Sequence, residues 1–251
     1  MYNYKKRSIV LNIVTALKIE ANPIIEHFKL KCENGIYKNE KINLIITGQG
    51  KIKSAVNTAL LLNSHNFPTL NFGICGSNKY DINRGFFIHK IIDTDTSFEY
   101  YPDYFKNNSE VLHTVSQIND YYPLVDMEGS GFFEACYKFL NVNEIILYKI
   151  VSDTPATPLK TDMIPELIKS HIHIIEEIIS NLKSNDIFKE IEILLYEASN
   201  KMHLTATQKN QLKLIFTLYK IKNKKIPNIP ILTKKEKVKN FITSLISSLE
   251  I

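Results

Sequence analysis

The chain has 251 residues, of which 44% are hydrophobic, which is enough for a sizeable core and fits either one α/β domain or a domain with an appendage. No stretch approaches the ~20 apolar residues of a membrane span, so we expect a cytoplasmic protein with no membrane partner. The three cysteines are far apart and odd in number, which provides neither a disulfide framework nor the spacing of a metal site. We therefore expect no metal and no cofactor.

The net charge of +5 is unevenly distributed along the chain. Residues 184–251 carry 12 lysines against 6 acidic residues, whereas residues 1–183 carry 19 basic and 20 acidic ones. The basic excess therefore belongs to the C-terminal segment. Arg7 and Arg84 are the only arginines in the sequence. Their scarcity matters because the planar guanidinium fork is the preferred group for holding a phosphate dianion.

Short β-branched apolar runs alternate with segments of helical periodicity over residues 1–183. The predicted strands lie at 9–15, 42–47, 69–74, 86–93 and 145–152. The predicted helices between and after them lie at 19–28, 52–63, 130–139 and 164–182. This alternation predicts an α/β fold with a mostly parallel sheet. Such sheets place their ligands beyond the carboxyl ends of the strands.

Residues 184–251 predict a second domain, a basic helical extension. The polar run at 184–186 predicts a chain break, followed by helices at 187–199, 205–220 and 234–249, with Thr205 or Thr207 as an N-cap. An apolar stripe on the second of these helices predicts packing onto the core or a neighbouring subunit: Leu204, Leu212, Ile215, Phe216 and Tyr219. Lysines can bind nucleic acid, but the scarcity of arginines and interleaved aromatics favours a solvated surface.

The segment LVDMEGSGFFEAC, residues 124–136, places two carboxylates beside a patch of small residues. One acidic residue would suffice to favour a helix N-terminus, so the pair Asp126 and Glu128 calls for a further explanation. One explanation is a small polar ligand that Glu128 binds while Asp126 is structural. The alternative is that both are solvent-facing residues of a loop.

Five segments, taken in order, resemble the nucleoside phosphorylase and nucleosidase superfamily, and most closely its methylthioadenosine/S-adenosylhomocysteine nucleosidases. They are IVTALKIEANPII (13–25), ITGQGKIKSAVNTALLL (46–62), NFGICGS (71–77), LVDMEGSGFFEAC (124–136) and YKIVSDTPAT (148–157). The resemblance covers residues 9–183. It implies a three-layer α/β/α fold around a mixed, mostly parallel twisted sheet, and a homodimer. It also implies cleavage of the N-glycosidic bond of a purine nucleoside resembling methylthioadenosine, by water or by phosphate.

The resemblance further implies catalytic roles for two acidic residues. Asp153 matches the general acid aimed at the purine N7, with Ser152 orienting its carboxyl group. Glu20 matches the glutamate that orients and activates water. Without the resemblance, Ser152 and Asp153 fit a strand end followed by a helix N-cap. Glu20 alone fits an exposed residue in the first turn of a helix.

Substrate-binding roles are implied for six residues. Glu128 matches the ligand of the ribose 2′- and 3′-hydroxyls, and Met127 would pack on the apolar face of the sugar. Ser152 supports the acid. Gly76, together with Cys75 and Ile74, matches the glycine turn where backbone N–H groups approach the ligand.

Water is the predicted nucleophile. Asn71 stands at the approximate position of a phosphate-binding arginine, and Ile74 stands where a small hydroxyl residue is expected. With two arginines in the chain, a dianion clamp is hard to assemble. A phosphate-dependent nucleoside phosphorylase remains the alternative. Ile74 and a shortened segment between Ser116 and Leu124 also leave open a non-catalytic nucleoside-binding or regulatory protein.

Overall fold

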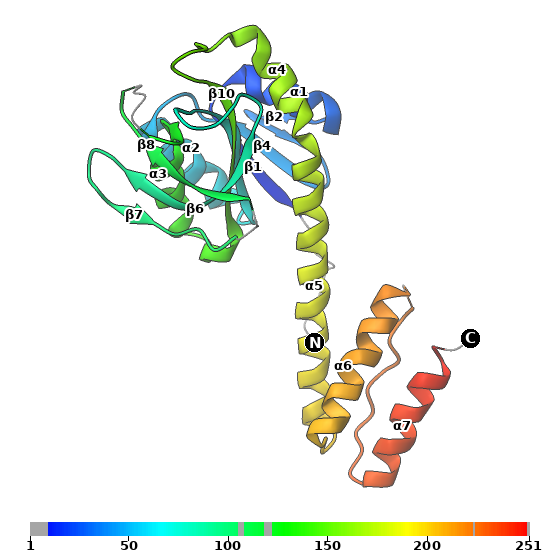
Figure 1. Ribbon diagram of the computed structural model, residues 1–251. Coiled ribbons are helices and arrows are strands. Elements are labelled where there is room, and N and C mark those ends of the chain that lie inside the picture. The colour runs from blue at the N-terminus through cyan, green and yellow to red at the C-terminus, as the bar shows by residue number, and fades with distance from the viewer. Residues whose placement is uncertain (1–9, 105–107, 118–121, 223, 250–251) are drawn as a thin grey trace. The chain divides into compact units, whose positions relative to one another are not determined.

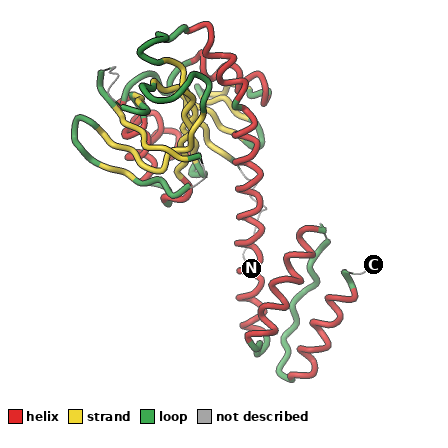
Figure 2. Tube along the Cα trace, in the orientation of Figure 1, coloured by secondary structure: helices red, strands yellow, loops and turns green. Residues whose placement is uncertain are grey.

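The structure is a computed structural model that describes residues 10–104, 108–117, 122–222 and 224–249. The chain divides into two compact units, Met1–Ile179 and Ser180–Ile251, which are described separately below. The first unit contains both strands and helices, and the second contains helices (Figures 1 and 2). Over the described residues, no helix is long and apolar enough to cross a bilayer.

The first unit is built on one ten-stranded sheet. Its strands are β1 (Leu11–Thr15), β2 (Lys31–Glu33), β3 (Ile36–Lys38), β4 (Ile42–Ile46), β5 (Thr69–Gly76), β6 (Gly85–Asp93), β7 (Glu99–Tyr100), β8 (Ser109–Thr114), β9 (Val125–Asp126) and β10 (Ile145–Asp153). The five predicted strands correspond to β1, β4, β5, β6 and β10. The other five were not predicted, because most of them have only two or three residues, too few for an alternating pattern to be decisive.

Part of this sheet closes on itself. The strands β4, β1, β5 and β10 pair in parallel. Beyond them, β10 pairs with β6, β6 with β8, β8 with β9, and β9 with β5, which completes a ring of five strands. The sheet is mixed, as predicted, but "mostly parallel" is wrong: among the described residues, five strand pairings are parallel and five are antiparallel. The reason is that the missed short strands add most of the antiparallel pairings.

Four helices of the first unit pack in two pairs. They are α1 (Lys18–Phe28), α2 (Lys51–Ser64), α3 (Gly129–Tyr137) and α4 (Ile164–Ser170), with 3-10 turns at Val142–Glu144 and Thr161–Met163. Helix α1 packs against α4, and α2 packs against α3. A Cβ atom on Gly131 would lie 2.2 Å from the carbonyl oxygen of Lys51, so only glycine permits this approach of α3 to α2. The α/β class is therefore established, and the three-layer arrangement stays a prediction.

The core of the first unit lies between the strands and the helix pair α2 and α3. It is formed by buried apolar side chains such as Val14, Ile88, Leu112, Phe132 and Val151. All five residues of β1 and eight of the nine residues of β10 are buried, which is typical of central strands covered on both faces. These two strands end at the site described below.

The second unit has a hydrophobic core of its own. Its helices are α6 (Ala206–Ile221), α7 (Lys235–Ser247) and the C-terminal part of α5 (Ile172–Lys201). The predicted stripe on α6 packs here, against residues of α5 and α7 such as Leu195 and Ile242, so its predicted placement on the first core or a neighbouring subunit is wrong. Thr205 is confirmed as the N-cap of α6, where its hydroxyl accepts the N–H of Gln208 at 3.2 Å.

Two predicted helix boundaries are wrong. The predicted helix 164–182 is interrupted at His171, between α4 and α5. The predicted break at 184–186 is absent, because the backbone of α5 continues through it. Serine, asparagine and aspartate each cost only about 0.5–0.7 kcal/mol in a helix relative to alanine, and no glycine or proline stands there to end it.

The predicted domains, 1–183 and 184–251, stay a prediction. The boundary between the two compact units falls after Ile179, inside α5.

Candidate active site

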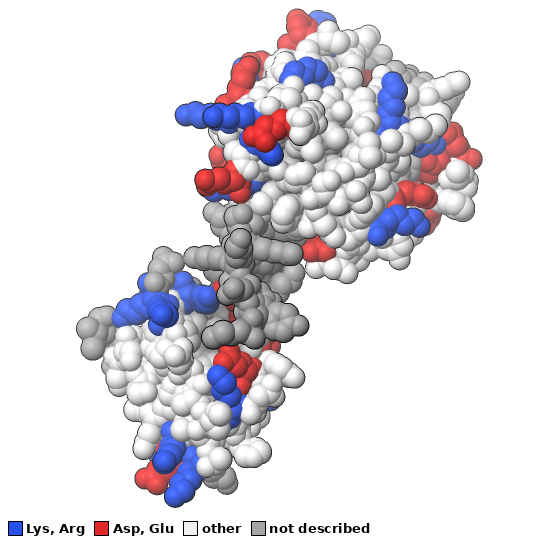
Figure 3. All heavy atoms as spheres, turned by 180° about the vertical axis from the view of Figure 1, so that it is seen from behind, with Lys and Arg blue, Asp and Glu red and all other residues white. Residues whose placement is uncertain are grey.

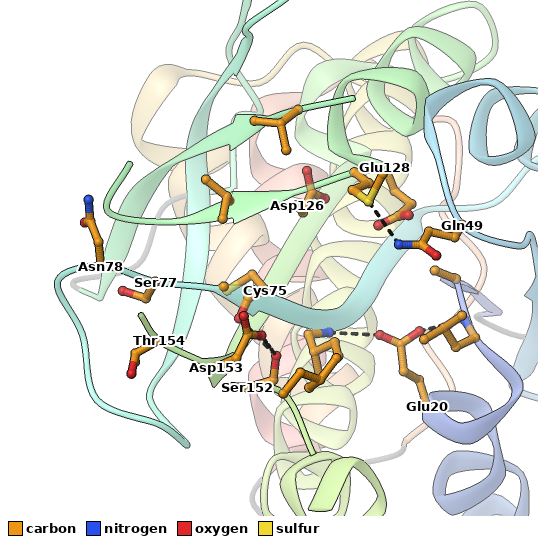
Figure 4. A pocket seen from close by; sticks show the side chains of 18 of the residues that line it. Glu20, Gln49, Cys75, Ser77, Asn78, Asp126, Glu128, Ser152, Asp153 and Thr154 are labelled. Carbon is orange, nitrogen blue, oxygen red and sulfur yellow. Dashed lines mark hydrogen bonds between the residues drawn. The ribbon is translucent and has the colours of Figure 1, made fainter. Parts of the chain in front are cut away.

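A cavity of about 160 Å³ opens where β1, β5, β9 and β10 end. This volume is several times the ~30 Å³ share of one water molecule, so the cavity has room for an organic ligand. All eight residues selected from the sequence line it: Glu20, Ile74, Cys75, Gly76, Met127, Glu128, Ser152 and Asp153. Figure 4 shows the labelled acidic side chains arriving from different elements around one space.

Glu20 reaches the cavity from the first turn of α1. The residue is 2% exposed, so its interpretation as an exposed helix residue is wrong. One carboxylate oxygen accepts the N–H of Leu17 at 2.7 Å and the other that of Ile74 at 3.0 Å. A Cβ atom on Gly73 would lie 2.7 Å from Glu20 Oε1, so glycine makes room for the carboxylate beside β5. Burial raises the pKa of Glu20, and these two N–H groups only partly offset that effect.

Glu128 stands at the N-cap of α3 and is 7% exposed, which excludes the solvent-facing loop. Its Oε1 accepts the backbone N–H of Gly50 at 2.8 Å. Burial, and then the negative charge of Asp126, raise the pKa of Glu128 to about 7. The ammonium group of Lys149 and the N–H of Gly50 act in the opposite direction. The carboxyl group is therefore held in one orientation and titrates near neutrality.

Asp126 forms a buried ion pair with Lys149. The distance between Lys149 Nζ and Asp126 Oδ2 is 2.8 Å, and the two side chains are 3% and 1% exposed. Asp126 also accepts the hydroxyl of Thr114 at 2.8 Å and the N–H of Gly129 at 2.9 Å. Burial lowers the pKa of Lys149, but the nearby carboxylates, Asp126 first, raise it by more. A lysine therefore remains charged among the acidic residues of the site.

Lys149 was not among the site residues predicted from the sequence. The signal was present, because Lys149 is the one charged residue inside the predicted buried strand 145–152. A lysine in such a strand is almost never fully buried unless it is paired. Its partner, however, lies 23 positions earlier in the chain, and only the fold brings the two together.

Asp153 ends β10, and its neighbour Ser152 orients it. The hydroxyl of Ser152 donates to Asp153 Oδ1 at 2.6 Å and lies 3.2 Å from the carbonyl oxygen of Cys75. A Cβ atom on Gly76 would lie 3.2 Å from Asp153 Oδ2, so this glycine keeps the approach to the carboxyl group open. Burial raises the pKa of the Cys75 thiol far above its usual range, so Cys75 lines the cavity as a neutral group.

The lining of the cavity is acidic. Four carboxylates contribute to it, from Glu20, Asp126, Glu128 and Asp153, and none of the described residues that line it is a lysine, arginine or histidine. Arg84 lies elsewhere, with its guanidinium carbon 5.6 Å from the ring centroid of Tyr80. Arg7 lies outside the described residues. In the part of the chain that the structure describes, no three His, Cys, Asp or Glu residues are placed to hold a metal ion.

Some sequence candidates do not reach the cavity. Tyr122 stacks on His113, with ring centroids 4.1 Å apart and an interplanar angle of 11°, and does not line the cavity. Tyr121 lies outside the described residues. Asn71 is buried in β5, where it is 2% exposed. It lies earlier on the strand than the lining residues Ile74, Cys75 and Gly76, and it does not line the cavity.

Comparison with protein-family models and with curated proteins finds no match for this chain. Solved structures do share its fold. Arabidopsis thaliana 5′-methylthioadenosine nucleosidase matches with a TM-score of 0.59 at 14% identity, covering 69% of this chain and 97% of that one. Helicobacter pylori futalosine hydrolase matches with a TM-score of 0.57 at 15% identity, covering 69% and 98%.

A third solved structure matches over a similar share of the chain. It is Helicobacter pylori 5′-methylthioadenosine/S-adenosylhomocysteine nucleosidase with butyl-thio-DADMe-Immucillin-A, with a TM-score of 0.53 at 15% identity, covering 70% of this chain and 98% of that one. Identities this low establish the fold alone. The chain therefore has the fold of these nucleosidases, and the superfamily resemblance found in the sequence is confirmed at that level.

Proposed function

We propose that this protein hydrolyses the N-glycosidic bond of a purine nucleoside, for which the sequence resemblance implies a methylthioadenosine-like compound. One observation carries the proposal. Asp153, Glu128 and Glu20, far apart in the sequence, line a single cavity. Hydrolysis of a nucleoside needs an acid for the leaving base, acceptors for the ribose hydroxyls and a base that orients water.

In the proposed reaction, water attacks C1′ of the ribose and the bond between C1′ and N9 breaks. The bonding electron pair goes to the purine, Asp153 delivers a proton to N7, and Glu20 takes a proton from the attacking water. Burial raises the pKa of Glu20, which makes it a stronger base once ionised. The ribose becomes oxocarbenium-like in the transition state, and the surrounding carboxylates stabilise its developing positive charge.

Glu128 would accept hydrogen bonds from the 2′- and 3′-hydroxyls. Its Oε1 is already held by the N–H of Gly50 at 2.8 Å, so the orientation of the carboxylate is set before a ligand arrives. Met127 precedes it in the cavity wall and would cover the apolar face of the sugar. Ser152 orients Asp153 through its hydroxyl, at 2.6 Å.

Water is favoured over phosphate as the nucleophile. A phosphate dianion would enter a space lined by four carboxyl groups and by no described basic side chain, and the nearby cation of Lys149 is already paired with Asp126. Charges of like sign at close range in a partly buried site repel each other strongly. A phosphorylase requires the opposite arrangement, with cations around the dianion.

We also propose a homodimer. Helix α2 exposes an apolar stripe formed by Ile52, Val56 and Leu60, which are 80%, 54% and 63% exposed. Residues spaced by four positions lie on one face of a helix, so the stripe is continuous. For the lysine-rich helices of the second unit we propose no nucleic-acid partner, because lysines such as Lys201, Lys213 and Lys220 pair with glutamates. On the face drawn in Figure 3, some lysines of this unit lie beside acidic side chains and others form a group of their own.

The test is a panel of purine nucleosides incubated with the protein in phosphate-free buffer and in phosphate, with products separated by chromatography. We expect a free purine base and free ribose sugar at the same rate in both buffers. Strict dependence on phosphate with a ribose 1-phosphate product would reassign the protein as a phosphorylase. Binding of a nucleoside without turnover in either buffer would identify a non-catalytic binding protein.

A further inference from the structure

Gln49 lies between two glycines in a tight turn that places it at the cavity. It lies between β4 and α2 and lines the cavity. Its neighbours Gly48 and Gly50 have φ angles of +84° and +103°, values that glycine adopts far more easily than other residues. The N–H of Gly50 is the group that holds Glu128. The turn therefore fixes Gln49 close to Glu128, the residue proposed to bind the ribose hydroxyls.

Gln49 lies at the end of the cavity opposite to the proposed base site. In Figure 4, Asp153, Thr154 and Asn78 lie toward one end, while Glu20, Glu128 and Gln49 lie toward the other. In a nucleoside, the base leaves C1′ on one side of the ring and the 5′ group leaves C4′ on the other. With the base at Asp153 and the ribose hydroxyls at Glu128, the 5′ group points to the end that holds Gln49.

The side-chain amide of Gln49 is available for a ligand. Its Nε2 donates to the sulfur of Met127 at 2.9 Å, and a thioether is a weak acceptor. Among the described residues, no group donates a hydrogen bond to its Oε1. A hydroxyl group can accept from the amide N–H and donate to the amide oxygen, whereas an alkylthio group can do neither well. Gln49 is exposed in the free protein, so a bound 5′-hydroxyl would replace water at the amide, whereas a bound alkylthio group would displace that water and leave the amide without an equal partner.

We propose that Gln49 determines the specificity for the 5′ substituent, and that the chain takes nucleosides with a free 5′-hydroxyl in preference to 5′-alkylthio nucleosides. This proposal rests on the proposed function, because the roles of Asp153 and Glu128 orient the ligand. It departs from the methylthio group that the sequence resemblance implies. A 5′-phosphate does not fit, because the described lining offers four carboxylates and no basic side chain to a dianion.

The experiment compares nucleosides that share a base and differ only at the 5′ position: adenosine with 5′-methylthioadenosine, and inosine with 5′-methylthioinosine. Both kcat/KM and the dissociation constant from calorimetry are measured for the parent chain and for Gln49→Met, which keeps the side-chain length and removes the amide. Gln211→Met, at an exposed position of α6, is the matched control. Thermal unfolding confirms that each variant is folded.

We expect the parent chain to prefer the 5′-hydroxyl compound of a pair. In Gln49→Met, kcat/KM and affinity for that compound fall about tenfold or more, while those for the methylthio compound stay within about threefold. Equal losses on both compounds, or a parent preference for the methylthio compound, would overturn the proposal. If no compound is hydrolysed, the proposed function fails, and the calorimetric affinities alone decide the role of Gln49. If no compound binds, both proposals fail.

Discussion

The two units of the molecule bury different kinds of side chain. The first unit buries charged residues, among them Glu20, Asp126, Glu128 and Lys149. In the second unit, the buried residues that the structure describes are all hydrophobic, and the carboxylates of its ion pairs, such as Glu192, are largely exposed. Taking an ion out of water costs several kcal/mol, so buried charges persist where they are paired or have a use. The contrast supports placing the proposed chemistry in the first unit, while the second unit buries an apolar core of its own.

The largest effect is expected at Asp153. Replacing it by asparagine removes the proton for the leaving base, and kcat should fall by about 10²–10⁴-fold with little change in melting temperature. Steady-state hydrolysis of the best nucleoside measures this effect. Asp162→Asn, at an exposed carboxylate of the neighbouring 3-10 turn, is the matched control and should keep full activity. An active Asp153→Asn variant would show that Asp153 is not the general acid and that the reaction does not depend on this end of the cavity.

Lys149→Met should destabilise the protein by about 3–5 kcal/mol, because it leaves the buried carboxylate of Asp126 without its cation. Urea unfolding measures the change. The double variant Asp126→Asn/Lys149→Met should recover part of the loss, since it leaves no buried charge unpaired. Lys169→Met removes a half-exposed lysine as a control and should cost less than about 1 kcal/mol. A harmless Lys149→Met would show that charge burial does not distinguish the two units.

Phe216→Ala tests the packing role of the second unit. Phe216 is fully buried in the core of that unit, and its truncation should cost about 3–5 kcal/mol of stability there. At 25 °C, kcat should be unchanged. The matched variant in the first unit, Phe132→Ala in α3, should reduce both stability and activity, because α3 carries Glu128 at its N-cap. A loss of kcat in folded Phe216→Ala would show that activity depends on the second unit as well.

Glu128→Gln should change how stability depends on pH. The pKa of Glu128 is raised to about 7 in the folded protein from an ordinary value of 4.5, so stability from this group is fully present below pH 4.5 and is lost as pH rises through 7. Glutamine does not titrate, so the variant should be more stable than the parent at pH 8, by up to about 3 kcal/mol, with little difference at pH 5. Urea unfolding at both pH values measures this. The exposed Glu26→Gln variant is the control, and a constant difference would contradict the prediction.

The smallest effect is expected at Lys213, which pairs with Glu192 on the surface of the second unit. The two side chains are 50% and 61% exposed, so Lys213→Ala should cost between zero and about 1 kcal/mol. The cost should vanish in 1 M salt, where exposed charges are screened. Unfolding in low and high salt measures it. A loss as large as that of Lys149→Met would mean that burial does not set the worth of an ion pair here.

The residues selected from the sequence line one cavity because a resemblance carried by five ordered segments singled them out, whereas the local pattern alone favoured a strand end at Asp153 and an exposed helix position at Glu20. Asp153 ends an apolar strand, Glu128 precedes a helix, and Glu20 opens one. All three line the cavity, while their catalytic and binding roles stay predictions. Gln49 lies within one of the matching segments, but its position was not singled out, since an exposed glutamine in a loop carries no signal by itself.

Features that depend on distant pairing could not be read in this way. The ring of strands closes through β8 and β9, which are too short or too polar to stand out, and through the antiparallel pairing of β6 with β10. The ion pair between Lys149 and Asp126 depends on the same closure. The continuity of α5 was missed for a local reason, because three weak helix formers look like a stop although their summed cost is small.

The pairing of β5 with β10 has a kinetic consequence. These strands supply Cys75 and Asp153 to the site, and the hydrogen bond that joins Ser152 to Cys75 spans 77 positions of the chain. Contacts so distant in sequence form slowly, since a long loop must close before they stabilise anything. A growing polypeptide therefore carries no assembled site until β10 has been synthesised, and refolding should restore helical signal earlier than it restores ligand binding.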